Sequence, residues 1–448
     1  MCLKDTADRI DLDPNFRGFA PRYARCAVSA SPAFGLVMIN ARLERLNDYP
    51  FQRLAELLQG NDPRANDKPV LLHVGEPQHQ PPAFALDVIA ADRTRWNQYP
   101  PFIGTPGLRE ACAGYLKRRY GVPDPALDAH KQITPVAGSR EGLFMAALLS
   151  ITPAEGNEPK PIALMPNPFY QVYFGAAVMA GAEPVFLPTS AKTNWLPDLD
   201  AISEETLRHT RIFYLCSPSN PQGTCADLAY WKKALTLARR HDFMLVADEC
   251  YAELYYTLDP PAGAIEAAVA LGAGPTGSVL DNLMVSHTLS KRSSAPGLRS
   301  AFLAGSPYVI ATLNRLRAYE AASIPISVMD ASEALWKDDA HVAVSREIYR
   351  RKYEICDRLF TGKYDYYRPA GGFYLWLNVG DGEIAARTLW REAGIKVLPG
   401  GYLTKPAADG SNFGWPYIRV ALVQELRTTE LALTRMSQVL AELPNGRA

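Results

Sequence analysis

Short apolar runs alternate with helical patterns along much of this chain, and this alternation restricts its fold more than any other feature. The sequence predicts strands at 70–74, 162–165, 184–187, 211–216, 243–247, 283–286 and 301–304. Helical patterns lie between these runs, at 106–119, 139–150, 169–180 and 227–241. Strands separated by helices need crossover connections, which produce a largely parallel sheet covered on both faces. We therefore expect an α/β fold.

The pattern changes after Ser306, which indicates a second domain. Longer helical stretches are followed by predicted strands at 373–377, 396–398 and 417–421 and by a closing helix at 424–443. A chain of 448 residues also exceeds the size at which a single core stops growing, about 250–300 residues. We expect a smaller α+β domain formed by 38–85 and 321–448, and a larger domain at 86–320.

Residues 1–37 form an N-terminal extension without a helix or strand period, and they lack the apolar core of a secretory signal. We expect either a disordered tail or a translation start at Met38.

Composition excludes several classes of protein. The 47 basic residues balance 47 acidic ones, and nucleic-acid-binding proteins are usually basic. No apolar stretch approaches the roughly 18 residues that span a membrane. The seven cysteines are scattered and never form a Cys-x-x-Cys pair, which predicts reduced thiols in a cytoplasmic protein without a metal site.

One glycine-rich segment imitates a dinucleotide-binding motif. Gly272, Gly274 and Gly277 match G-x-G-x-x-G, but an alanine-rich helical stretch precedes them and a predicted strand follows. The dinucleotide motif needs a strand, a turn and a helix in that order, so we interpret this segment as a loop.

The segment 286–299 carries the strongest chemical signal. It combines Lys291 with the hydroxyls of Thr288 and Ser290 and the guanidinium of Arg299. A cofactor with an aldehyde and a phosphate needs such a set: an amine to join the aldehyde, and hydroxyls with a cation to hold the phosphate. A surface loop is the alternative, since lysines beside serines are common there.

Two further candidates follow predicted strands. Asp248 ends the apolar run 243–247, with Tyr251 three residues later, and Asn220 lies in a turn after the run 211–216. Ligands of open α/β sheets bind beyond the carboxyl ends of strands, so these side chains would face a shared crevice. The alternatives are an aspartate that caps a turn and an ordinary Asn-Pro turn.

Gly138, Ser139 and Arg140 follow an apolar run at 133–136 and open a helical pattern. A glycine turn at a helix N-terminus offers free N–H groups to a phosphate, and Ser139 is also a candidate N-cap. Arg419 lies in the apolar run 417–421, where a buried guanidinium needs a carboxylate partner. That partner is either a bound ligand or an internal acidic residue.

Together these motifs resemble the class I and II aminotransferases of fold type I, which use pyridoxal 5′-phosphate (PLP), and the resemblance covers about residues 38–440. It implies a mostly parallel seven-stranded sheet in the larger domain. It also implies that Lys291 holds the cofactor covalently, that Asp248 pairs with the ring nitrogen, and that Tyr251 and Asn220 contact the ring oxygen. The resemblance assigns the remaining roles as follows: Ser139, Arg140, Thr288, Ser290 and Arg299 at the phosphate, Tyr170 stacked on the ring, and Arg419 with Gly75 and Asn220 at the substrate carboxylate.

Tyr99 matches a family tyrosine that reaches the phosphate in the neighbouring subunit. The resemblance therefore implies a homodimer with shared active sites that acts on amino acids and oxo acids.

A narrower resemblance rests on four segments. The stretch after Lys291 ends in Gly-Leu-Arg299, whereas aspartate aminotransferases usually end it in Gly-Trp-Arg. With 167–173, 249–255 and 372–376, it is most similar to the proteobacterial N-succinyldiaminopimelate aminotransferases of lysine biosynthesis. This similarity implies transamination between N-succinyl-2-amino-6-oxopimelate and glutamate, with Arg42, Arg140 and Arg292 as candidates for binding the distal end of the substrate.

Other interpretations stay open: specificity for aspartate or aromatic amino acids, or carbon–sulfur lysis or decarboxylation with the same cofactor. A cofactor-sensing regulator would need a helix-turn-helix module ahead of the fold, for which residues 1–37 are too few.

Overall fold

The computed structural model describes residues 39–443 except 47, 65–67 and 321, so the predictions for 1–37 lie outside the described residues. Within the described part, seven strands form one sheet in the order β2-β8-β7-β6-β5-β3-β4. Their bounds are β2 Ile133–Val136, β3 Ile162–Asn167, β4 Glu183–Pro188, β5 Thr210–Cys216, β6 Met244–Asp248, β7 Leu283–Thr288 and β8 Ala301–Ala304.

Most neighbours in this sheet run parallel, as predicted. β4, β3, β5, β6 and β7 are parallel in turn, whereas β8 runs antiparallel to both β7 and β2. The register places Cys216 beside Asp248 and Asp248 beside Ser286. The carboxyl ends of the central strands therefore lie together at one edge of the sheet.

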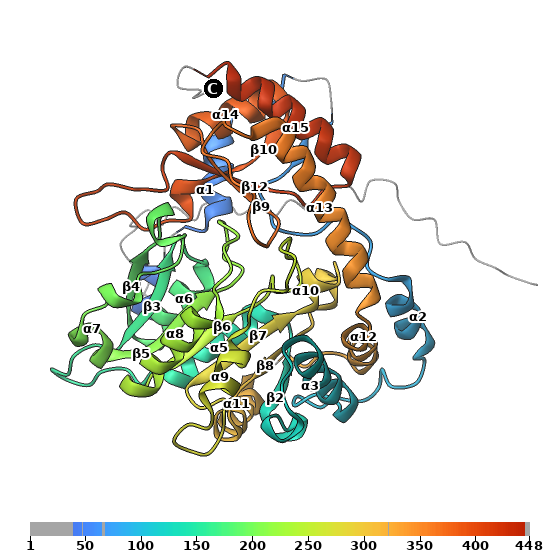
Figure 1. The fold of residues 1–448 in the computed structure, drawn as a ribbon, viewed down its shortest axis with the longest axis vertical. Coiled ribbons are helices and arrows are strands. Elements are labelled where there is room, and N and C mark those ends of the chain that lie inside the picture. Colours follow the sequence, from blue (N-terminus) through green and yellow to red (C-terminus); the bar gives the residue numbers. More distant parts are fainter. Residues whose placement is uncertain (1–38, 47, 65–67, 321, 444–448) are drawn as a thin grey trace, which may run out of the picture. The chain divides into compact units, whose positions relative to one another are not determined.

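Helices cover both faces of the sheet, because its strands are apolar on both sides (Figure 1). On β5, Phe213 and Leu215 pack into one core cluster, while Ile212 and Tyr214 pack into another on the opposite face. The first cluster includes residues of α3 (Pro106–Tyr120), α8 (Leu228–His241), α9 (Ala264–Leu271) and α12 (Ile326–Lys337). The second includes residues of α5 (Ser139–Ser150), α6 (Gln171–Ala180) and α11 (Pro307–Glu320).

Two smaller sheets form a separate group. β1 (Val70–Leu71) pairs in parallel with β10 (Ile395–Lys396), and β12 (Tyr417–Ala421) lies between β11 (Leu398–Pro399) and β9 (Tyr374–Asn378) in antiparallel pairing. Their core is shared with α13 (Ala340–Phe360), α14 (Gly382–Ala393) and α15 (Leu426–Ala441), which gather around these strands in Figure 1.

The remaining elements are shorter. They are the helices α1 (Pro50–Leu58), α2 (Ala83–Ala91), α4 (Ala129–Gln132), α7 (Glu204–His209) and α10 (Leu289–Arg292), and the 3₁₀ turns η1 (Ala41–Arg45), η2 (Asp124–Ala126), η3 (Ala191–Thr193), η4 (Leu199–Ala201), η5 (Pro296–Leu298) and η6 (Gly400–Tyr402).

Two predicted strands differ from the structure. The run 70–74 forms only the two-residue β1, and the run 396–398 is divided between β10 and β11, which pair with different partners. The glycine-rich segment 272–277 is a loop between α9 and β7, as predicted. The division into domains at 85 and 320 stays a prediction.

No helix in the described part of the chain is long and apolar enough to cross a membrane.

Candidate active site

A cavity of about 180 Å³ lies at the carboxyl edge of the larger sheet. β6 contributes Asp248, the turn after β5 contributes Asn220, and α10, directly after β7, contributes Lys291. Because these strands are parallel, their carboxyl ends meet at one edge, where open α/β sheets bind ligands. The predicted site residues that line this cavity are Gly75, Ser139, Arg140, Tyr170, Asn220, Asp248, Tyr251, Lys291 and Arg419.

Lys291 is the amine of this cavity. Its Nζ donates a hydrogen bond to the carbonyl of Gly75. Burial lowers the pKa of Lys291 from 10.5 to about 8, because the charged form loses its hydration. Above that pH the amine is mostly neutral, which is the form that attacks carbonyl carbons and accepts protons.

Asp248 is a buried carboxylate with few donors. The hydroxyl of Tyr173 donates to its Oδ2 at 2.5 Å, and the backbone N–H of Cys250 donates to its Oδ1 at 3.3 Å. Within the described residues, no basic side chain forms an ion pair with Asp248. Burial raises the pKa of this carboxyl group. A carboxylate has about four acceptor sites, so Asp248 can accept a further, cationic donor from the cavity.

Tyr251 and Tyr374 form a pair of phenols on the wall of the cavity, with their hydroxyls 3.1 Å apart. The Tyr374 hydroxyl leaves no room for a side chain on Gly75, because a Cβ there would lie 1.8 Å from it. The glycine at position 75 is thus required by the approach of this tyrosine.

Arg419 is the second cation of the cavity, and it is only 4% exposed. Its guanidinium donates to the side-chain oxygen of Asn220 at 3.1 Å and to the carbonyl of His73 at 2.8 Å. Burial lowers the pKa of His73 to about 3, so the imidazole is neutral beside it. Arg419 has no carboxylate partner among the described residues, so the predicted alternative of an internal salt bridge is not observed. A ligand carboxylate would complete its coordination.

Groups suited to a phosphate surround the N-terminus of α5. Gly138 takes the N-cap position with φ 92°, and no side chain caps the helix, so the prediction of Ser139 as N-cap is wrong. The chain turns into the helix at Gly138, whose positive φ favours glycine, so Ser139 is already the first helical residue. A side chain at position 138 is also excluded, because a Cβ there would lie 1.9 Å from the guanidinium of Arg299. Arg299 donates to the carbonyl of Ala137 at 3.2 Å, directly before this turn.

The hydroxyls of Thr288 and Ser290 lie 3.0 Å apart, and Thr288 also donates to the carbonyl of Ser300, next to Arg299. Neither of these two residues lines this cavity or the second cavity that adjoins it, whereas Arg299 lines the second cavity.

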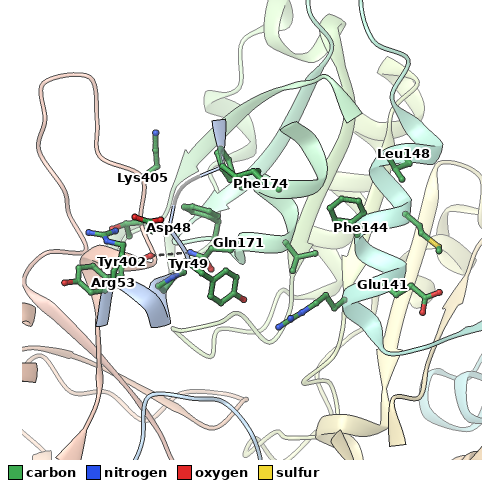
Figure 2. A pocket seen from close by; sticks show the side chains of 18 of the residues that line it. Asp48, Tyr49, Arg53, Glu141, Phe144, Leu148, Gln171, Phe174, Tyr402 and Lys405 are labelled. Atoms are coloured by element: carbon green, nitrogen blue, oxygen red, sulfur yellow. Dashed lines mark hydrogen bonds between the residues drawn. The ribbon is translucent and has the colours of Figure 1, made fainter. Parts of the chain in front are cut away.

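A second, larger cavity of about 1120 Å³ adjoins the first. Figure 2 shows Phe144 and Leu148 of α5 on one side of it and Tyr402 and Lys405 on the other. Residues shared by the two linings mark the junction: Tyr49, Pro50, Arg140, Phe169 and Gln171.

The structure separates the three arginines considered for the distal end of a substrate. Arg140 lies at the junction of the cavities, where its Nε donates to the Tyr170 hydroxyl at 3.1 Å. Arg292 is buried elsewhere and forms an ion pair with Asp339. Arg42 donates to the carbonyl of Met179 at 2.8 Å and lines neither cavity.

Tyr99 is fully exposed and lies outside both cavities. Its predicted contact with a neighbouring subunit stays a prediction.

Two residues of the site were not assigned from the sequence. Tyr173 binds Asp248, and Tyr374 binds Tyr251. The spacing of Tyr170 and Tyr173 on one helical face was a usable signal for the first. No local pattern indicated the second, because 123 residues separate the two phenols.

Residues 67–422 match the family model "Aminotransferase class I and II". The solved structure of an aminotransferase from Neisseria meningitidis is 38% identical, covers 90% of this chain and 100% of its own, and superposes with a TM-score of 0.83. LL-diaminopimelate aminotransferase of Nitratidesulfovibrio vulgaris is 28% identical over 387 residues, 83% of this chain and 91% of its own length. A probable N-succinyldiaminopimelate aminotransferase of Thermus thermophilus is 25% identical over 87% of this chain and 100% of its own, with a TM-score of 0.72.

The fold is thus that of an amino-group transferase, and the chain belongs to the class I and II aminotransferase family. Enzymes of this family depend on PLP.

The described residues fit this cofactor. Asp248 is buried and has no cationic partner among the described residues, which suits the protonated ring nitrogen of PLP. Gly138 and Arg299 leave an uncapped helix N-terminus beside a guanidinium, which suits a phosphate.

Proposed function

We propose that the smaller cavity is the catalytic centre and that Lys291 is its catalytic amine. When bound, PLP supplies an aldehyde that joins amino groups and a ring that takes up negative charge from the substrate α-carbon. Lys291 is the residue that would hold the aldehyde carbon. Asp248 would keep the ring nitrogen protonated, and Tyr251 and the amide nitrogen of Asn220 would donate to the ring oxygen.

The phosphate would lie at the start of α5. Ser139, Thr288 and Ser290 offer hydroxyls there, and Arg140 and Arg299 offer positive charge. Tyr170 would cover one face of the ring, since it lines the cavity and its ring contacts that of Tyr173.

Lys291 also moves the proton in this proposal. With its pKa lowered to about 8, the free amine could take a proton from the substrate α-carbon and deliver it, on the other side of the amino nitrogen, to the carbon that was the aldehyde carbon of the cofactor. Arg419 orients the substrate through its α-carboxylate, with Gly75 close by. Amino acids and oxo acids both carry this carboxylate. A single arginine can therefore bind both the amino donor and the amino acceptor.

For the substrate, we infer N-succinyl-2-amino-6-oxopimelate as amino acceptor and L-glutamate as donor, a step towards diaminopimelate and lysine. The inference is supported by the resemblance of four sequence segments and by the name of the relative from Thermus thermophilus. It is also supported by the larger cavity: the smaller one has room for the reacting end, and the long anionic arm would pass Arg140 into the space beyond.

A second candidate is LL-diaminopimelate itself, since relatives 28–29% identical carry that name. Both molecules have a distal carboxylate, so Arg140 is consistent with either. Aspartate, aromatic amino acids and carbon–sulfur lysis have no observation in their favour beyond the shared fold.

A steady-state screen tests this proposal. The enzyme loaded with PLP is given glutamate and one acceptor at a time, and 2-oxoglutarate is measured. The reverse reaction with LL-diaminopimelate and 2-oxoglutarate is run alongside. We expect the highest kcat/KM with the succinylated acceptor. A higher value with LL-diaminopimelate selects the second candidate, and a higher value with oxaloacetate overturns both.

Arg140→Met sharpens the screen. Loss of a charged partner costs about 1.5–3 kcal/mol, so kcat/KM for the long acceptor should fall at least about tenfold more than for oxaloacetate. Lys405→Met, on the far wall of the larger cavity, is the matched control and should not change this ratio. An equal loss for both acceptors in Arg140→Met would assign Arg140 to the phosphate alone.

We also propose a homodimer, because Tyr99 and Trp96 are 102% and 64% exposed on a segment that the family resemblance places at the neighbouring site. Sedimentation and mixing of Tyr99→Phe with Lys291→Ala subunits would test shared sites. The cytoplasm is the proposed compartment, since the cysteines in the described residues are free thiols.

A further inference from the structure

Tyr173, to which the family resemblance assigned no role, forms a hydrogen bond with Asp248. Tyr173 is 1% exposed, and its hydroxyl is the closest donor to the carboxylate, at 2.5 Å. A distance of this size is typical of a hydrogen bond between a hydroxyl and an ionised oxygen. The backbone N–H of Cys250, at 3.3 Å, is a weaker donor.

The ring of Tyr173 is held in a fixed orientation. It stacks on Tyr214 with ring centres 4.5 Å apart and planes 7° apart. Tyr214 is itself anchored, because its hydroxyl donates to the carbonyl of Leu143 at 2.9 Å. Tyr173 also forms an edge-to-face pair with Tyr170, with ring centres 5.5 Å apart and planes at 89°.

Tyr173 is also a permanent donor. Burial, followed by the neighbouring charge of Asp248, raises the pKa of its phenol well above 10. The proton on this hydroxyl is therefore present throughout the pH range in which enzymes work, and the hydroxyl donates it to Asp248.

We propose that Tyr173 is a positioning residue that keeps Asp248 ionised and aimed at the ring nitrogen of PLP. The mechanism is local. A buried carboxylate without a donor takes up a proton, and a protonated Asp248 cannot keep the ring nitrogen charged. By donating to Oδ2, Tyr173 stabilises the anion, and Oδ1, which accepts only the weaker Cys250 N–H among the hydrogen bonds described, keeps an acceptor site for the ring. The proposal rests on PLP binding but not on the identity of the amino acceptor, so its test can fail while the substrate proposal stands.

The test compares Tyr173→Phe with Tyr214→Phe in the holoenzyme without substrate. Both variants keep the stacked rings and lose one buried hydroxyl, but only the first loses a donor to Asp248. A hydrogen bond to a charged group contributes about 1.5–3 kcal/mol, so the dissociation constant of PLP should rise at least about tenfold in Tyr173→Phe. Tyr214→Phe should stay within about twofold of the wild type.

The visible absorption of the bound cofactor provides a second readout. When a smaller fraction of the ring nitrogen is protonated, the ring withdraws less electron density. The pKa of the nitrogen that would join the cofactor to Lys291 should then rise. The midpoint of the absorption change with pH should move upward in Tyr173→Phe and stay unchanged in Tyr214→Phe. Equal shifts in both variants, or none in Tyr173→Phe, would overturn the proposal.

A double-mutant cycle separates positioning from packing. In an Asp248→Asn background, Tyr173→Phe should have almost no further effect on PLP affinity, because the charge that it stabilises is gone. If Tyr173→Phe weakens PLP binding by the same factor in both backgrounds, the tyrosine only fills space and the proposal is wrong.

Discussion

Asp248 and Glu249 are consecutive carboxylates at the end of β6, and they differ in how completely the protein satisfies their hydrogen bonds. Glu249 is satisfied within the protein: it accepts hydrogen bonds from the Tyr120 hydroxyl at 2.9 Å and the backbone N–H of Ala264 at 2.6 Å, and it lies 3.1 Å from His287. Asp248 has one phenol and one distant amide, and its remaining acceptor sites face a cavity. Both are almost fully buried, so burial alone does not identify the functional carboxylate.

The buried cations divide in the same way. Lys352 donates to His79 at 2.7 Å and to the carbonyl of Leu422 at 2.7 Å, and Arg292 binds Asp339. Lys291 and Arg419 bind only neutral acceptors among the described residues, as Lys352 does, but unlike Lys352 and Arg292 they line the cavity. Incomplete coordination at a cavity wall is therefore the mark of the residues that bind ligands.

The lysines give the largest expected difference. Lys291→Ala removes the amine that joins the cofactor and moves the proton, so kcat should fall by at least about 10³ and the absorption that depends on this bond should disappear. Lys352→Met should keep the absorption and kcat within about threefold, because its side chain lies outside the cavity. Turnover assays and visible spectra check both. Normal activity in Lys291→Ala would remove this lysine from the mechanism.

The carboxylates come next. Asp248→Ala should lower kcat by about 10² to 10³, because charge at the reacting centre loses its stabilising partner. Glu249→Gln should leave kcat within about threefold but reduce the free energy of unfolding by about 1–3 kcal/mol, since it weakens buried hydrogen bonds. The pair is measured by kinetics and by chemical denaturation. Equal catalytic losses would abolish the distinction between them.

For the arginines, the expected contrast is smaller. Arg419→Met should lower kcat/KM for glutamate by at least about thirtyfold, since truncating one partner of a buried charge pair costs about 2–5 kcal/mol. Arg292→Met should lower the melting temperature instead, because Arg292 packs against Tyr115 and Trp336 with its charged end on Asp339. An unchanged KM in Arg419→Met would assign the substrate carboxylate to another group.

The last expected effect concerns the pH dependence of stability. Burial lowers the pKa of Lys352 from 10.5 to about 7 in the folded protein, so between these values the unfolded chain binds more protons than the folded one. Stability from this residue therefore increases as pH rises above 7. From pH 7 to 9 the wild type should gain up to about 3 kcal/mol relative to Lys352→Met, measured by denaturation at each pH. The pKa of His79 is lowered to about 4, so this histidine does not titrate in that window.

Strands with continuous apolar runs were predictable from the sequence. β2, β8 and β12 have the predicted bounds, and almost all of their residues are buried. The sequence did not predict how the runs 70–74 and 396–398 are divided into strands. The ends of β1, β10 and β11 depend on pairing with partners more than 20 residues distant. An apolar run shows that a segment is buried, whereas pairing decides how much of it is a strand.

At the site, most of the residues predicted from the order of motifs line the cavity. Chain order could not show that Ser139 lies one residue past the N-cap, because that depends on the chain turning into the helix at Gly138. Nor could it show that Arg140, and not Arg42 or Arg292, faces both cavities.

By itself the sequence determined the chemical groups of this protein and the strand ends that carry them, since both follow from local residue types. Only the tertiary structure decided which groups are left with unused hydrogen-bonding capacity. Asp248 and Glu249 are adjacent and share almost the same local sequence, yet Tyr120, Ala264 and His287 surround one and a cavity meets the other. The partners come from distant parts of the chain, and their positions follow from packing across the sheet.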